Sequence, residues 1–526
     1  MSKDSDTPAS RKPAKPIGRF GTGSLSLLQV LCFTILFAGV NYLSSQYYAP
    51  KDLSADAAFT LSPATRRFLE SPAVQEREEP IRMLVAFRRN NGFYDRVRAL
   101  GEEYMRVSKD KVKLELVDPI RSPDRTQQIK EAYRKVFGAA FNGQTMFTSD
   151  LVIIDARTRE QKDALVNSPN ETPSGSNIRF IESENMARFE TDLKGQRKIT
   201  GFVGEDALTT GLVAAIEGKP RKVYLFTDKS GYTVDTVDSP LSTFEGILLS
   251  QNALTMRAPI SSLERIPDDA AAVAIINPVY DFTPQELDVL GEYWNRPKSG
   301  VLVTLGAQDT PPRLRAFLRN LGITPGRDRV ITAKGDQVIS TVRGTFKGGM
   351  EFTKDFWDKV ATFEGATSSL DIRDSDNEDL LNRKIMPYTL LETGPEFCGE
   401  TRFGSPNPAF DSREDNPGPA RLAGAVIRGA ATRDDVGEQA SKMVVISNSD
   451  FLSPKHLTDI NRNFLASTAN WLVGRDELTG FGPRTLGTYK LPLLDSQVSF
   501  INRVNLFFLP GFAFLIGLVV WSSRRA

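Results

Sequence analysis

The chain has 526 residues, and its 66 lysines and arginines balance 65 aspartates and glutamates, so it lacks the basic excess that nucleic-acid-binding domains carry. It contains one histidine, His456, and two cysteines, Cys32 and Cys398. Metal sites built on paired imidazoles and redox or zinc sites built on paired thiols are therefore excluded. The G-x-x-x-x-G-K-[ST] loop for nucleotide hydrolysis is absent. We expect no cofactor.

An apolar run without charged residues covers residues 25–45 and follows an N-terminal tail rich in lysine and arginine. A cleavable signal peptide begins in a similar way, but no A-x-A cleavage site follows this run promptly, which favours an uncleaved anchor. Its main polar interruptions are Gln29 and Asn41. The pattern predicts a transmembrane helix over residues 24–45 behind a cytoplasmic tail, residues 1–23.

A second run without ionisable side chains covers residues 504–521, with Pro510 as its helix breaker and Arg524 and Arg525 behind it. About 20 apolar residues span a bilayer, and flanking arginines can extend a slightly shorter run. The alternative is a buried core helix, which usually shows one polar face. Because positive flanks stay cytoplasmic, both termini are expected inside and residues 46–503 outside.

The segment between the anchors is long enough for two or three domains. Ser62 followed by Pro63 predicts a helix start, since the serine hydroxyl caps free amides and proline fits the first turn. Strands and helices then alternate: strand 81–89, helix 94–107, strand 111–119, helix 127–137 and strand 150–156. This order is typical of a small α/β unit, thioredoxin-like in outline. Because Cys-x-x-Cys is absent, we interpret it as a packing or docking module.

A segment rich in Asn, Pro, Ser and Gly at 167–177 predicts a linker, and a larger α/β domain follows it. Its expected elements are a helix and strand within 204–228, helix 241–251, strand 271–278, helix 282–296, strand 300–306, helix 311–322, strand 442–451 and helix 454–473. Thr283, Pro284 and Glu286 form a capping box. Apolar strands alternating with helices predict an open, doubly wound parallel sheet covered on both faces, flavodoxin- or amidotransferase-like.

Residues 333–441 break this rhythm and predict an irregular insertion, with an exposed loop at 404–420. The acidic stretch 371–379 resembles a calcium-binding loop only in composition. Aligned from Asp374, it has Asp379 where the loop needs glycine and Ile385 where it needs glutamate, so we expect a solvated face.

Ligands of open parallel sheets bind beyond the carboxyl ends of the strands. The residues expected there are Asp228, Asn277, Tyr280, Gly306, Asn448 and Asp450. They suit hydrogen bonds to a neutral polar ligand or to a partner loop. The alternative is that they cap the helices that follow the strands. No G-x-S-x-G elbow accompanies His456, which stands at an expected helix start, so we predict no catalytic residue.

Four stretches together resemble one family: FTLSPATRRFLES, GEDALTTGLVAAIEGKPRKVYLFTD, AIINPVYDFTPQELDVLGEYWNRPKSGVLVTLG and VVISNSDFLSP followed by NRNFLASTANWLVGRDEL. The chain resembles the GldG-type auxiliary subunits of ABC transporters associated with gliding motility. The resemblance covers most of the chain and weakens between 333 and 441. It implies a non-enzymatic extracytoplasmic component of a bacterial inner membrane, whose partners are a polytopic ABC permease and a cytoplasmic ABC ATPase.

One turn departs from the family. Many relatives carry a Gly-His-Gly-Glu-like turn after the strand VYLFT, where this chain has Asp228, Lys229, Ser230 and Gly231. We therefore expect no function that depends on that histidine, including amidotransferase-like chemistry. Two alternatives stay open: a stand-alone envelope protein that binds sugars or glycopeptides, and a hydrolase with an unrecognised site.

The expected organisation divides the chain as follows: cytoplasmic tail 1–23, transmembrane helix 24–45, stalk and first helix 46–79, thioredoxin-like unit 80–166, linker 167–199, doubly wound domain 200–480 with insertion 333–441, stalk 481–503, transmembrane helix 504–522 and cytoplasmic end 523–526.

Overall fold

The structure is a computed structural model. It describes residues 19–46, 60–137, 149–167, 177–191, 197–232, 239–334, 337–373, 377–404, 410–429, 439–480, 482, 486–487 and 495–523. The chain forms two compact units, residues 1–58 and 59–526, and each is described by itself.

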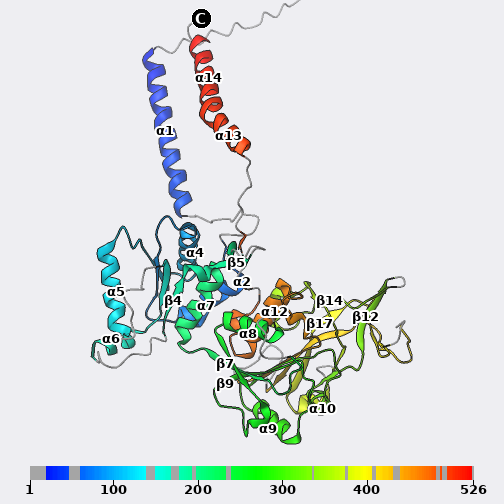
Figure 1. Cartoon of the computed structure of the whole chain (residues 1–526). Coiled ribbons are helices and arrows are strands. Elements are labelled where there is room, and N and C mark those ends of the chain that lie inside the picture. Colours follow the sequence, from blue (N-terminus) through cyan, green and yellow to red (C-terminus); the bar gives the residue numbers. More distant parts are fainter. Residues whose placement is uncertain are drawn as a thin grey trace, which may run out of the picture. The chain divides into compact units, whose positions relative to one another are not determined.

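The described part of the first unit is one helix, α1 (Arg19–Gln46) (Figure 1). Its apolar stretch Leu27–Leu43 is exposed along its length and is shorter than a typical membrane span. Two polar side chains on it bond to the helix's own carbonyls: Thr34 Oγ1 donates to Val30 O at 2.9 Å, and Asn41 Nδ2 donates to Phe37 O at 2.9 Å. Self-satisfied polar groups of this kind are compatible with an apolar surrounding.

At the other end, residues Ser499–Ser523 form a continuous helical stretch that is long and apolar enough to cross a membrane, with a mean hydropathy of 2.1. It runs from α13 (Asp495–Arg503) through one turn of π-helix (Val504–Phe508) into α14 (Leu509–Ser523). Pro510 is the second residue after the π turn. A proline ring clashes with the carbonyl four residues earlier, and a wider turn relieves that clash without ending the helix.

The first core is built on a four-stranded sheet with the order β2-β1-β3-β4. β1 is parallel to β2, and β3 is antiparallel to both β1 and β4. The strands are β1 (Ile81–Ala86), β2 (Val112–Val117), β3 (Leu151–Asp155) and β4 (Ile178–Glu182). The helices are α2 (Pro63–Glu70), α3 (Pro72–Gln75), α4 (Tyr94–Val107), α5 (Pro123–Phe137), α6 (Arg159–Asn167) and α7 (Gly204–Glu217).

Alternate residues of β1 point to opposite faces of this sheet, as strand geometry requires. Met83 and Val85 pack in one apolar cluster with α4 and α7, while Leu84 and Ala86 pack in another with α5. The sequence assigned the helix at 204–217 to the second domain, beginning at residue 200. The structure instead buries its apolar face, including Leu212, against the first sheet, so the first core extends to residue 217.

The expected linker 167–199 is also shorter than predicted, and its stretch 168–176 lies outside the described residues. Residues 178–182 form β4, with Ile178 and Ile181 buried. After the short 3₁₀ turn Ser183–Met186, β5 (Ala187–Thr191) pairs with β6 (Arg197–Phe202), which also pairs with β21 (Leu486–Gly487). Five-residue strands with two buried side chains give too weak a periodic signal to separate from a polar linker.

The second core is built on a nine-stranded sheet with the order β15-β14-β17-β19-β20-β10-β9-β7-β8. The strands are β7 (Arg221–Phe226), β8 (Ala253–Ala258), β9 (Ala270–Ile276), β10 (Gly300–Thr304), β14 (Val342–Phe346), β15 (Val360–Phe363), β17 (Ile385–Thr393), β19 (Arg421–Arg428) and β20 (Ser441–Ile446). The helices are α8 (Pro240–Ser250), α9 (Pro284–Trp294), α10 (Pro312–Asn320), α11 (Glu378–Asn382) and α12 (Asp459–Leu472), with 3₁₀ turns η4 (Ile260–Ser262), η5 (Glu351–Phe356), η6 (Asp450–Leu452) and η7 (Asp476–Leu478).

The prediction of an open parallel sheet holds for only part of this sheet. β8, β7, β9, β10 and β20 are parallel, and helices cover both faces, with α8 and α12 in one apolar cluster and α9 and α10 in the other. The other four strands are antiparallel and come from residues 342–428. The segment predicted as an irregular insertion, 333–441, therefore contributes four strands, β14, β15, β17 and β19, that extend the same sheet.

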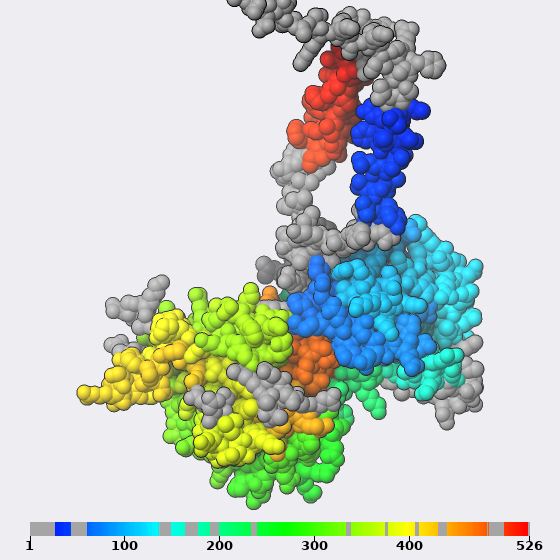
Figure 2. All heavy atoms as spheres, turned by 180° about the vertical axis from the view of Figure 1, so that it is seen from behind, coloured from blue at the N-terminus to red at the C-terminus, as the bar shows by residue number. Residues whose placement is uncertain are grey.

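Two small separate sheets accompany this extension: β11 (Ile323–Pro325) pairs with β16 (Leu370–Ile372), and β12 (Arg329–Lys334) pairs with β13 (Gln337–Ile339) and β18 (Cys398–Glu400). In Figure 2, residues of this part stand out from the second core as a yellow projection. The expected loop at 404–420 is exposed over most of its described residues but ends in buried Ala420.

Candidate functional site at the carboxyl ends of the parallel strands

The parallel strands give the second core a topological switch point. Numbered in chain order, the five parallel strands lie side by side as 2-1-3-4-5. The chain moves one way along the sheet from β7 to β8 and then reverses from β8 to β9. Open sheets with this order bind ligands at the carboxyl ends of the two strands that flank the switch. The six residues singled out in the sequence all follow the carboxyl ends of β7, β9, β10 or β20, as expected.

The two loops at the switch point are joined to each other. Gly231 N donates to Asn277 O at 2.8 Å, and Val279 N donates to Lys229 O at 2.9 Å. A Cβ on Gly231 would come within 2.7 Å of Val279, and a Cβ on Gly306 would overlap the amide of Asn277. Asn277 itself has a φ of +47°, a conformation that asparagine tolerates better than most residues. These contacts tie the two loops at the switch point to each other.

The carboxylate of Asp228 is engaged by the backbone. It accepts hydrogen bonds from Ile260 N at 2.9 Å and Ser261 N at 3.1 Å, at the start of η4. This contact differs from the capping alternative, because the helix that follows β7 is α8, which Ser239 caps, whereas η4 follows β8.

Lys229, which the sequence analysis did not single out, makes a buried ion pair. Its Nζ lies 2.8 Å from Glu286 Oε2, and the two side chains are 9% and 8% exposed. The ammonium also lies 5.4 Å from the centre of the Phe282 ring. Glu286 completes the predicted capping box of α9 with Thr283, which is confirmed. The pair ties the switch-point loop to α9, and only the capping-box glutamate was visible in the sequence.

The residues after β20 hold a neighbouring segment of the chain. Asn448 Nδ2 donates to Glu364 O and to Thr367 Oγ1, each at 2.9 Å. Asp450 accepts from Tyr232 OH and from Ala366 N, each at 3.1 Å. Burial and the charge of Asp450 raise the pKa of the Tyr232 phenol. Asn448 and Asp450 are thus hydrogen-bonded to other residues of the fold.

Tyr280 and Gly306 differ from these residues. The Tyr280 side chain is 62% exposed, so its ring is open to solvent beside the switch point. Gly306 leaves the space that the Asn277 side chain occupies.

The structure places His456 against the backbone of a neighbouring turn. Its Nδ1 lies 3.3 Å from the backbone carbonyl of Asp450, not from a carboxylate or a hydroxyl. It lies in a turn before α12 and not at the start of a helix, because Thr458 caps the helix by accepting from Asn461 N. Cys398 is partly buried, and burial and the charge of Asp415 raise the pKa of its thiol.

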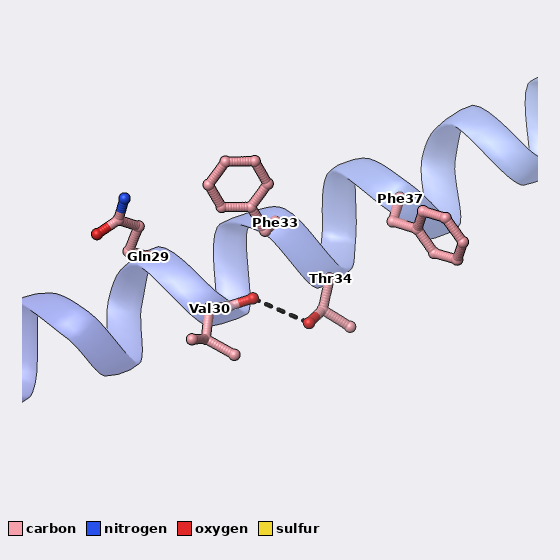
Figure 3. A pocket seen from close by; sticks show the side chains of 5 residues that line it. All are labelled: Gln29, Val30, Phe33, Thr34 and Phe37. Atoms are coloured by element: carbon pink, nitrogen blue, oxygen red, sulfur yellow. Dashed lines mark hydrogen bonds between the residues drawn. The ribbon is translucent and has the colours of Figure 1, made fainter. Parts of the chain in front are cut away.

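Among the described residues, no group of three or more His, Cys, Asp or Glu side chains could hold a metal ion. Residues 374–376 of the acidic stretch fall outside them, and the stretch that follows begins α11, capped by Asn377. A hollow on α1 is lined by side chains from three turns of that one helix: Gln29, Val30, Phe33, Thr34 and Phe37 (Figure 3). It is an open surface groove and encloses no ligand site.

No protein-family model matches the chain, and no curated protein matches it. Among solved structures, the N-terminal domain of mmIFT52 is similar with 14% identity and a TM-score of 0.33, over 48% of this chain and 98% of that one. A putative ThuA-like protein from Bacteroides uniformis is similar with 11% identity and a TM-score of 0.29, over 50% of this chain and 95% of that one. Alpha-L-fucosidase isoenzyme 2 from Paenibacillus thiaminolyticus is similar with 12% identity and a TM-score of 0.25, over 52% of this chain and 37% of that one. Similarities this distant identify neither a family nor an activity.

Proposed function

We propose that this chain is a non-enzymatic, membrane-anchored auxiliary subunit of an ABC-type transport system, GldG-like in role. In this proposal α1 and the helical stretch 499–523 cross a bacterial inner membrane, both termini are cytoplasmic, and both cores lie outside the cytoplasm. The partners are a polytopic permease and a cytoplasmic ABC ATPase.

The observation that carries the proposal is that described polar groups at the switch point are bonded to other parts of the fold. A ligand-binding or catalytic α/β domain of this strand order keeps polar groups free at that edge. Here Asp228, Asn448 and Asp450 are bonded to backbone amides or carbonyls, and Lys229 is neutralised by Glu286. A domain whose polar side chains at the sheet edge are bonded within the fold suits a scaffold that docks on other proteins.

The first core supports the same assignment. Its strand order and directions match a thioredoxin-like unit, and the loop after β1 is where such a unit carries its redox cysteines. That loop instead holds Arg88, whose Nε lies 3.0 Å from Asp150 Oδ1, and Asn91, whose Nδ2 donates to Asp150 at 2.6 Å. A salt-bridged polar loop without thiols suits docking and not electron transfer.

The test is affinity purification of the full chain in a mild detergent, followed by identification of co-purifying proteins. A multi-span membrane protein and an ABC ATPase are expected. Recovery of a clean monomer under gentle conditions counts against the proposal. Protease added to intact spheroplasts should digest both cores, and complete protection would refute the topology.

The exposed ring of Tyr280 favours one other candidate, an envelope protein that binds sugars or glycopeptides without a transporter. Aromatic faces at the edge of a site are suited to stacking on sugar rings. A thermal shift with cell-wall fragments that Tyr280→Ala abolishes would favour this candidate over the transport subunit.

A further inference from the structure

Two segments connect the cores to the terminal helices, and they pack on each other. The first holds α2, and the second follows α12 and includes η7. Leu61 and Phe68 of the first share an apolar cluster with Leu478 of the second. Arg67 of α2 donates to the carbonyl of Thr479 and forms an ion pair with Asp355 of η5 at 2.8 Å.

The second segment is bonded to both cores through Arg475. Its side chain is 2% exposed, and its guanidinium contacts both carboxylate oxygens of Glu217 at 2.7 and 2.5 Å. It also donates to the carbonyls of Gln251 and Asn252. Glu217 ends α7 in the first core, while Gln251 and Asn252 join α8 to β8 in the second. One buried side chain thus bridges the two cores.

Gly480 fixes the end of this segment. Its φ is +101°, and a Cβ there would overlap the guanidinium of Arg67 and the carboxylate of Asp355. Its amide donates to Ser467 Oγ of α12 at 2.8 Å. The position therefore needs glycine both for its backbone and for the ion pair that lies against it.

We propose that residues 475–480 form a latch that holds the two cores together and couples their relative orientation to the segment leading into the C-terminal helix. Movement of that segment withdraws Arg475 from Glu217 and Thr479 from Arg67 together. A buried charge that loses its partner is strongly destabilised, so the latch is either engaged or released and does not stretch gradually. The inference does not depend on the transport partners.

The experiment uses the full chain in detergent, with Cys32 and Cys398 replaced by serine. Spin labels at Gln127→Cys on α5 and Asp288→Cys on α9, both exposed, report the distance between the cores. Gly480→Ala is compared with Gly474→Ala.

Gly474 is the matched control for Gly480. It also has a positive φ, +78°, but a Cβ there meets no atom within 4 Å. Both variants carry the same kind of backbone strain, and Gly480→Ala alone displaces the Arg67–Asp355 pair. We expect a second, longer distance population in Gly480→Ala and the unchanged single population in Gly474→Ala.

Arg67→Gln keeps the test decisive if Gly480→Ala does not fold, because this partly exposed residue carries no backbone strain. It should also add the longer population. Distance distributions in Gly480→Ala and Arg67→Gln that match those of Gly474→Ala and the parent chain would overturn the proposal.

Discussion

Replacing Lys229 by Met should destabilise the second core far more than breaking an exposed ion pair does. Lys229 and Glu286 lie 2.8 Å apart and are both more than nine-tenths buried. At an effective dielectric constant of 20, the attraction between unit charges at this separation is roughly 6 kcal/mol, which desolvation of the two ions largely offsets. Removal of the lysine leaves the carboxylate of Glu286 desolvated, with only the Thr283 amide as a donor. Losses of this kind cost about 3–5 kcal/mol.

Two measurements test this: thermal unfolding of the full chain, and the protection of the backbone amides of β7 and β9 against hydrogen exchange. For a core of this size, each kcal/mol lowers Tm by about 2–4 °C, so Lys229→Met should lower it by roughly 6 to 20 °C. The double variant Lys229→Met with Glu286→Gln should recover most of this loss. Glutamine keeps the capping box but carries no charge.

Lys354→Met is the matched control. Lys354 pairs with Glu351 at 3.0 Å, but the side chains are 55% and 79% exposed, so the change should cost less than about 1 kcal/mol. If Lys229→Met costs no more than Lys354→Met, or if the double variant is as unstable as the single one, the buried pair does not tie the switch-point loop to α9 as argued.

Three further predictions concern other parts of the chain. Burial and the charge of Glu205 raise the pKa of Asp206 to about 6, so its contribution to stability is present below pH 4 and is lost as the pH rises through 6. Asp206→Asn should therefore raise the free energy of unfolding at pH 7.5 by at most about 3 kcal/mol, seen as a higher Tm, and leave it unchanged at pH 4. Gly306→Ala must displace Asn277 and should lower the free energy of unfolding by about 1–3 kcal/mol. Gly291→Ala, in open space within α9, should be neutral or stabilising. Leu515→Arg in α14 should cost about 3–4 kcal/mol of membrane insertion and shift a reporter fused to that helix into the soluble fraction after alkaline extraction.

Local signals predicted individual elements well. α4 spans Tyr94–Val107 as expected, and Ser62 caps α2 by accepting from Thr65 N. These features depend on neighbours within one helical turn, so a single sequence contains the information. Predicted strand alternation was less reliable at an edge. On the edge strand β2, Val112 is buried but Leu116, four residues later on the same face, is 41% exposed.

Longer-range features could not be read from the sequence. α7 is apolar enough to cover either sheet, and only the three-dimensional contact decides that it covers the first one. The four antiparallel strands within 342–428 are separated by turns of irregular length, so they lack the regular rhythm of the parallel strands. The engagement of Asp228 and Asn448 depends on residues 32 and more than 80 positions away, which no local pattern reveals.

The turn after β7 links the departure from the GldG-type pattern to the proposed role. A histidine there would titrate near neutral pH and leave a polar group at the switch point. Lys229 is buried and pairs with a glutamate already fixed by its own helix cap. Its backbone carbonyl accepts a hydrogen bond from Val279 N, so the side chain and the backbone of Lys229 both tie the loops at the switch point.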